Sequence, residues 1–245
     1  MNVSPTPAAP RNPRLLVIDT SVLMQLIVSE HVAVLKHLKS DFAIQPTIVP
    51  AVESEALHLT KNGPAKFRGR ETYLKKALAN RALATLSSDL LDSIWGNSGA
   101  AWIRQIDQEG HRLAAFVDRG EAFTHAASMV LNVPGVTNDF SAVNVLLRRR
   151  EQLPQPILRF WDLIVFGHQS GTLDEAACDK VRKSLHKAGE RLPLCFSNCS
   201  YRDGLNSFYC RLINQGRPVK GLNAPPERED GNRMYLVRTT AIGQS

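Results

Sequence analysis

Short apolar runs that alternate with helical segments constrain the fold of this chain more than any other feature of its sequence. Residues 15–18 form an apolar run without alternating polar positions, which is typical of a strand buried on both faces of a parallel sheet. Further strands are expected within 41–49, over 135–137 and over 157–160, with helices between them. This order predicts an α/β protein with three layers, α/β/α, around a central, mostly parallel sheet.

The same pattern divides the chain into three parts. Residues 1–13 contain prolines and no apolar run, so we expect a disordered tail and not a signal peptide. Residues 14–192 hold the predicted sheet as one domain, and 193–245 are expected to form a hairpin or a partly disordered extension. Helices are predicted over 22–38 with a break near residue 29, from residue 50, over 71–115 with an interruption at 96–99, and over 120–131, 139–150, 163–171 and 174–189.

Composition and cysteine usage bear on where the protein works. No apolar run approaches the roughly 20 residues that cross a bilayer, so the sequence predicts no membrane span and a cytoplasmic location. The cysteines form no CxxC pair and are expected to be reduced thiols, although a soft-metal site involving the last three stays open. They are Cys178, Cys195, Cys199 and Cys210.

Acidic residues follow the predicted strands at the positions where open parallel sheets bind ligands. Asp19 follows the first strand, Glu53 and Glu55 lie in the helix after the second, Glu121 opens a later helix, and Asp139 follows the third strand. Clustered carboxylates repel one another unless they share protons or hold a cation. Ligation by oxygen alone suits Mg²⁺ or Mn²⁺, which can activate water for phosphodiester hydrolysis.

Each of these acids also has a plainer interpretation. Asp19 and Asp139 could cap the helices that follow them, and Glu121 could complement a helix dipole. Asp118 is expected to be a solvated turn residue, and His125 to be a packed or surface histidine.

The net charge of +7 is unevenly distributed. Basic residues cluster between 61 and 81 and again at 148–150, a pattern that favours polyphosphate partners, although a solvated helical face would look the same. The residues predicted to hold RNA phosphates are Lys66, Arg68, Arg70 and Arg148. The tryptophans, Trp161 among them, are expected to anchor the core or an interface and not to stack on bases.

Four segments, taken in order, resemble the motifs of PIN-domain ribonucleases. They are LLVIDTSVL at 15–23, VPAVESEA at 49–56, DRGEA at 118–122 and TNDF at 137–140. The resemblance implies that Asp19, Glu121 and Asp139 hold the metal and that Glu55, with Glu53 less favoured, completes the shell. Hydrogen bonds to these carboxylates are expected from Thr20, Ser21, Thr137 and Asn138, although a plain turn or cap role would suit Ser21 and Asn138 equally well. The stretch 63–117 and the tail beyond 192 are longer than in short members of the family.

The leading hypothesis is therefore a Mg²⁺- or Mn²⁺-dependent endoribonuclease. Its resemblance to the toxins of bacterial toxin–antitoxin pairs implies an antitoxin partner and a homodimer, whereas a housekeeping RNA-processing nuclease would need no antitoxin. The alternative is a catalytically silent PIN-like module that binds RNA or protein. A phosphatase of the haloacid-dehalogenase type is disfavoured because Ser21 stands where that class needs a second aspartate.

Overall fold

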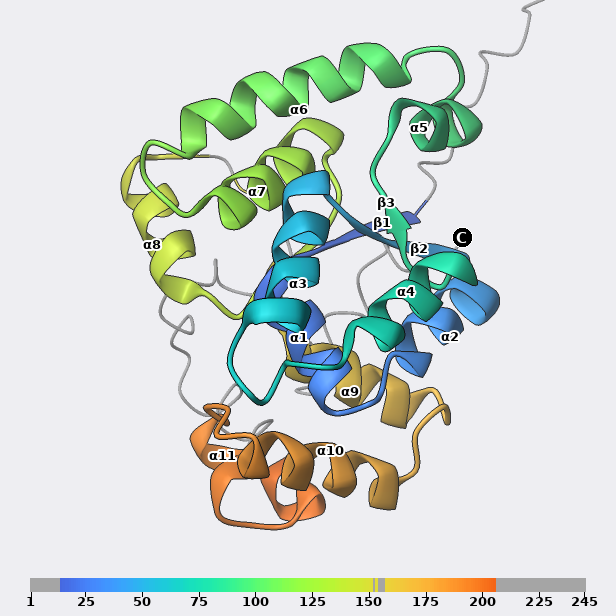
Figure 1. Cartoon of the computed structure of the whole chain (residues 1–245), viewed down its shortest axis with the longest axis vertical. Helices are drawn as coiled ribbons and strands as arrows, with labels where there is room; N and C mark the ends of the chain where they lie inside the picture. Colours follow the sequence, from blue (N-terminus) through green and yellow to red (C-terminus); the bar gives the residue numbers. More distant parts are fainter. Residues whose placement is uncertain (1–13, 152, 154–156, 206–245) are drawn as a thin grey trace, which may run out of the picture.

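A five-stranded, all-parallel sheet forms the centre of the molecule, in the strand order β3-β2-β1-β4-β5. The computed structural model describes residues 14–151, 153 and 157–205. Helices flank the sheet, as the predicted three-layer α/β/α fold requires (Figure 1). The strands are β1 (Arg14–Ile18), β2 (Ile44–Ile48), β3 (Ala84–Thr85), β4 (Gly135–Val136) and β5 (Ile157–Leu158).

The helices occupy the connections between the strands and the chain after β5. Helices α5 and α6 lie at one end of the molecule, with α6 packed along α7, and α10 and α11 lie at the opposite end (Figure 1). The helices are α1 (Thr20–Val28), α2 (Ala33–Phe42), α3 (Pro50–Asn62), α4 (Glu71–Ala79), α5 (Ser88–Trp95), α6 (Gly99–Leu113), α7 (Arg119–Leu131), α8 (Phe140–Arg148), α9 (Phe160–Gln169), α10 (Glu175–Lys187) and α11 (Leu194–Ser197).

The apolar run at 15–18 lies in β1, the middle strand. All four of its side chains are buried, because β1 has a strand on each side and helices cover both faces of a parallel sheet. The helix breaks expected near residue 29 and at 96–99 are both present, between α1 and α2 and between α5 and α6.

Residues 71–115 are mostly helical, as predicted, but they also contain the short strand β3, which the sequence did not indicate. This strand has only two residues and pairs with the end of β2, Thr47 with Ala84 and Ile48 with Thr85. Two residues are too few to leave a strand periodicity in the sequence, so only the pairing reveals the strand. The last strand is also shorter than expected, because Phe160 already begins α9.

Aromatic packing continues beyond residue 192, where the sequence suggested a boundary. Phe196 and Tyr201 are fully buried, and the Phe196 ring stacks on Trp161 with centroids 4.2 Å apart. Residues 193–205 therefore add to the central core. The predicted N-terminal tail and most of the extension lie outside the described residues. The suggested soft-metal site is also outside them in part, since neither the side chain of Cys195 nor Cys210 is described.

No helix in the described part of the chain is long and apolar enough to cross a membrane.

Candidate functional site

The site lies where the strand order reverses at the centre of the sheet. From β1 the chain proceeds to β2 and β3 on one side, whereas β4 and β5 lie on the other side. Open parallel sheets bind ligands beyond the carboxyl ends of the strands at such a switch point. Asp19 directly follows β1 and Thr137 directly follows β4, and the Asp19 N–H donates to the Val136 carbonyl at 3.0 Å.

Asp19 is a buried carboxylate held by two hydroxyl groups. Its side chain is 2% exposed, and Oδ2 accepts hydrogen bonds from Ser21 Oγ at 2.8 Å and Thr137 Oγ1 at 3.2 Å. Burial raises the pKa of Asp19, and these two hydrogen bonds oppose the rise. Asp19 stands at the N-cap position of α1, yet its side chain makes no capping hydrogen bond. The helix-cap interpretation therefore does not account for this carboxylate.

A cavity of about 300 Å³ lies beside Asp19, and we call it the acidic hollow. The side chains around it carry an excess of negative charge, and among the described residues that line it Lys66 is the only cation. The carboxylates that line the acidic hollow are Asp19, Glu55, Asp118, Glu121 and Glu190. The structure thus gathers acids from the turn before α1, from α3, from the start of α7 and from the loop after α10, which are distant in the sequence.

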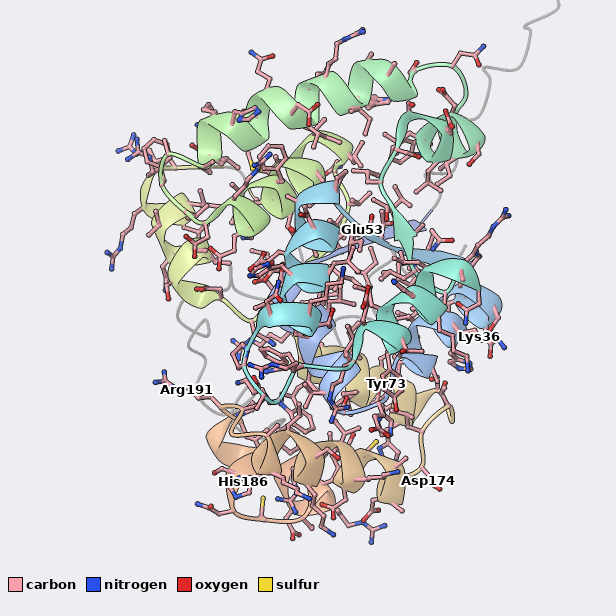
Figure 2. All side chains as sticks on the ribbon, viewed as in Figure 1. Lys36, Glu53, Tyr73, Asp174, His186 and Arg191 are labelled. Carbon is pink, nitrogen blue, oxygen red and sulfur yellow. The ribbon has the colours of Figure 1, made fainter. Side chains whose placement is uncertain are left out.

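The structure places the two glutamates of α3 in different surroundings. Glu55 lines the acidic hollow, and its Oε2 accepts a hydrogen bond from Thr20 Oγ1 at 2.7 Å. Glu53 lies between α3 and β3, where its Oε2 accepts from Thr85 Oγ1 at 2.6 Å (Figure 2). Of the two residues that the sequence left open, Glu55 is therefore the one at the site.

Glu121 and Asp139 form a coupled pair of carboxyl groups. Burial, a hydrogen bond to Asp139 and the charges of Asp139, Asp19 and Asp118 raise the pKa of Glu121 to about 8. Burial alone would raise the pKa of Asp139, but hydrogen bonds from Glu121 and from the first turn of α8 lower it. Near neutral pH, Glu121 therefore keeps the proton of this pair and Asp139 carries the charge.

Asp139 also caps α8, as its plainer interpretation predicted. Its Oδ1 accepts from the Ser141 N–H at 2.7 Å and the Ala142 N–H at 3.0 Å. These bonds hold the carboxyl group next to Glu121, so capping and a place at the site are compatible for this residue.

Polar groups connect these carboxylates around the rim of the site. Thr137 Oγ1 accepts from the Asp139 N–H at 3.0 Å, and Ser21 Oγ accepts from the Asn138 N–H at 3.3 Å. Asn138 Nδ2 donates to Gln25 Oε1 at 2.8 Å. All four residues predicted to support the carboxylates, Thr20 included, thus make hydrogen bonds at this edge of the sheet.

Only one of the four residues predicted to bind RNA lies at the acidic hollow. Lys66 lines it and forms an ion pair with Glu190. Arg68 donates to the Gly63 carbonyl at 3.2 Å, and Arg70 donates to the Lys66 carbonyl at 3.1 Å, so both bond to the loop between α3 and α4. Arg148 is exposed at the end of α8.

The sequence did not single out Gln25, Gly120 or Glu190. Gln25 lies four residues after Ser21 on α1, so helical spacing could have placed it on the same face as that residue. Gly120 lies against Glu55, since a Cβ there would come within 2.5 Å of Glu55 Oε2. Glu190 reaches the site from a point 165 residues after Gln25, and no local pattern indicates this contact.

His125 lies in α7, four residues after Glu121, and is buried at 4% exposure. Its Nε2 has no hydrogen-bond partner among the described residues. Burial lowers the pKa of His125 to about 4, against the opposing charge of Asp139. Of the two settings expected for it, the structure shows the packed one.

The donor set suits a hard cation, because carboxylate oxygens surround the acidic hollow. Burial is the main cause of the raised pKa of Glu121, and the charges of Asp139, Asp19 and Asp118 add to the rise. In the described residues, however, no three His, Cys, Asp or Glu side chains are grouped so as to hold a metal ion. Asp19, Glu55 and Asp139 instead accept hydrogen bonds from hydroxyl and backbone donors.

None of the family models, curated proteins or solved structures compared with the chain matches it. The function is therefore argued from the residues and their geometry.

Proposed function

We propose that this protein is a Mg²⁺- or Mn²⁺-dependent endoribonuclease of the PIN type. The observation that carries the proposal is the convergence of Asp19, Glu55 and Glu121 on one hollow at the switch point of the sheet, with Asp139 paired to Glu121. The described lining of the hollow has five carboxyl groups, of which Glu121 keeps its proton near neutral pH, against one lysine, and this excess of acids repels a phosphodiester unless a cation offsets it. Hydrolysis of a phosphodiester is the chemistry that combines such a cation with this donor set.

In this proposal Asp19, Glu121 and Asp139 would hold the cation, which when bound supplies a water of lowered pKa and polarises the phosphate. Ser21 and Thr137 fix the Asp19 carboxylate through their hydroxyl groups. Thr20 holds Glu55 at the hollow, where its carboxylate can orient the attacking water. No side chain needs to act as the nucleophile.

A second candidate is a catalytically silent module that binds RNA or protein. The observation that favours it is the lack, among the described residues, of three side chains grouped as a ready metal site. The two candidates differ in one outcome: a nuclease cleaves RNA when a divalent cation is added, whereas a silent module binds its partner and does not cleave RNA.

The replacement Asp19→Asn tests the proposal. It should abolish cleavage of a mixed structured RNA with Mn²⁺ or Mg²⁺, while the wild type cuts with either metal and stops in EDTA. The amide oxygen can still accept from Ser21 and Thr137, and the cost of burying a charge disappears, so the melting temperature should be unchanged or higher. Cleavage is followed on denaturing gels and folding by thermal melts.

Asp107→Asn, on the exposed surface of α6, is the matched control and should cut like the wild type. Metal-dependent cutting that persists in Asp19→Asn at equal purity would contradict the proposed site. If the wild type binds this RNA with and without metal but never cuts it, the silent module becomes the better description.

A further inference from the structure

A second cavity, of about 650 Å³, adjoins the acidic hollow, and we call it the second hollow. The two cavities share Ser21, Gln25, Lys66 and Glu190 among their lining residues. Its volume lies within the range of small-ligand sites and is large enough for a nucleotide. Anything bound there would lie directly next to the carboxylates.

The two hollows differ in charge. Three cations, Lys66, Arg159 and Arg191, line the second hollow, against the two acids Asp139 and Glu190. The acidic hollow has five carboxylates and one lysine. A phosphate group therefore meets less negative charge in the second hollow than in the acidic hollow, although part of the Arg159 charge faces the buried Asp162.

Glu190 occupies the boundary between the hollows in the manner of a bound anion. One carboxylate oxygen accepts from Lys66 Nζ at 2.5 Å and the other from Gln25 Nε2 at 3.1 Å. The Glu190 side chain is only 14% exposed, so this ion pair is largely shielded from solvent. Paired donors on two oxygens of one anion are also what a phosphate group needs.

The donors that face Glu190 are themselves fixed in place. Gln25 Oε1 accepts from Asn138 Nδ2 at 2.8 Å, and Asn138 Oδ1 accepts from the Phe160 N–H at 3.2 Å at the start of α9. Gln25 therefore presents its amide N–H to the boundary whether or not Glu190 is present, because its oxygen stays bonded to Asn138.

We propose that the second hollow binds the phosphate of the nucleotide next to the cleaved bond of a single-stranded RNA. Lys66 and Gln25 hold Glu190 in the RNA-free protein, and the phosphate replaces its carboxylate on these donors. Arg191 supplies further positive charge from the same wall. The inference rests on the proposed function, since RNA is the substrate of that same site.

The test measures RNA binding without cleavage. A fluorescein-labelled single-stranded RNA of mixed sequence is titrated in EDTA at several salt concentrations, and binding is followed by fluorescence anisotropy. Glu190→Gln should bind the RNA about tenfold more tightly, because a neutral amide competes less well with a phosphate for Lys66. Lys66→Met and Arg191→Met should each weaken binding.

The salt dependence separates a phosphate contact from a structural effect. Each lost contact to a single strand should make the slope of log K against log salt less negative by about 0.7, and Glu190→Gln should make the slope more negative. Arg104→Met, on the exposed surface of α6, removes the same kind of charge outside both hollows and is the control. Thermal melts identify any variant that fails to fold.

Binding by Glu190→Gln that equals or falls below that of the wild type, with an unchanged melting temperature, would overturn the inference. Equal salt slopes for Lys66→Met, Arg191→Met and the wild type would also overturn it, and this measurement stands if Glu190→Gln does not fold. Cleavage with Mn²⁺ reports on the proposed function separately. If the wild type cleaves RNA but the variants show none of these changes in affinity or salt slope, only the proposed phosphate site is contradicted. If the variants show the changes but the wild type does not cleave RNA, only the proposed nuclease activity is contradicted.

Discussion

The hydroxyl group of Thr137 connects two of the proposed metal ligands. It donates to Asp19 Oδ2 at 3.2 Å and accepts from the Asp139 N–H at 3.0 Å, and the side chain is 1% exposed. A buried polar group that loses its partner costs more free energy than the hydrogen bond contributed when it was present. This residue therefore affects both stability and the direction in which the Asp19 carboxylate points.

Thr137→Val should lower the free energy of unfolding by about 1 to 2 kcal/mol, because it leaves the Asp139 N–H without its acceptor. Cleavage should fall as well, since Asp19 loses one of its two hydroxyl donors. Urea denaturation and a cleavage assay measure the two effects. Thr124→Val is the matched control, because the buried Thr124 hydroxyl has no hydrogen-bond partner among the described residues, and it should be neutral or stabilising.

His125 predicts a dependence of stability on pH. Its pKa is about 4 in the folded chain against the ordinary histidine value of 6.5, so the unfolded chain takes up a proton first as the pH falls. His125 therefore does not lower the free energy of unfolding above pH 6.5, but it lowers it progressively as the pH falls from 6.5 towards 4.

His125→Leu removes this titration. The free energy of unfolding of the wild type should therefore fall, relative to that of His125→Leu, by about 2 kcal/mol between pH 7 and pH 5. Denaturant titrations of both proteins at several pH values check this. If the difference in free energy of unfolding between the wild type and His125→Leu does not change with pH, then His125 takes up a proton as readily in the folded state as in the unfolded state.

At the scale of elements, the contact of α7 with α3 and α1 determines where Glu55 lies. A Cβ on Gly120 would come 2.5 Å from Glu55 Oε2 and 3.3 Å from Thr20 Oγ1. The absence of a side chain at residue 120 thus allows the start of α7 to approach the Thr20–Glu55 hydrogen bond closely. In the PIN resemblance the same glycine precedes the glutamate of α7.

Gly120→Ala should displace the Glu55 carboxylate with little cost in stability. The carboxylate is the end of a flexible, exposed side chain that can move aside, and alanine favours the helix more than glycine does. Cleavage should fall by about tenfold while the melting temperature stays equal or rises. The single variants and the double variant Gly120→Ala/Glu55→Ala form a double-mutant cycle. A further loss of activity from Gly120→Ala in the Glu55→Ala background would contradict this explanation.

At the scale of the whole molecule, the chain after α10 completes both the core and the site. The Phe196 ring lies between Trp161, at 4.2 Å, and Tyr201, at 5.8 Å, and all three side chains are buried. Trp161 also lines the second hollow, as do Glu190 and Arg191, which closely precede Phe196. Packing of this segment therefore holds one wall of the second hollow.

Phe196→Ala should lower the free energy of unfolding by about 3 to 4 kcal/mol, since it removes a fully buried ring from a stacked cluster. Tyr73→Ala, at a side chain that is 39% exposed, is the control and should cost less than about 1 kcal/mol. Chemical denaturation followed by tryptophan fluorescence compares them. Equal losses would show that residues 193–205 do not contribute to the core.

The sequence alone determined the fold class and the places of the first carboxylates. The run at 15–18 is a local signal, and a residue that directly follows a strand lies at the sheet edge whatever the rest of the chain does. Asp19, Thr137 and Asp139 could be placed for this reason. The sequence also suggested that Asp19 and Asp139 could cap the helices that follow them. In the structure the Asp139 side chain caps α8, whereas the Asp19 side chain makes no capping hydrogen bond to α1.

Only the tertiary structure decided which partners meet across long stretches of chain. Lys66 and Glu190 are 124 residues apart, and the choice of Glu55 over Glu53 depends on how α3 faces α1 and β3. The two-residue strand β3 and the burial of Phe196 and Tyr201 likewise exist only through their partners. Contacts of this kind leave no periodicity in a single sequence, because their energy comes from side chains that folding brings together.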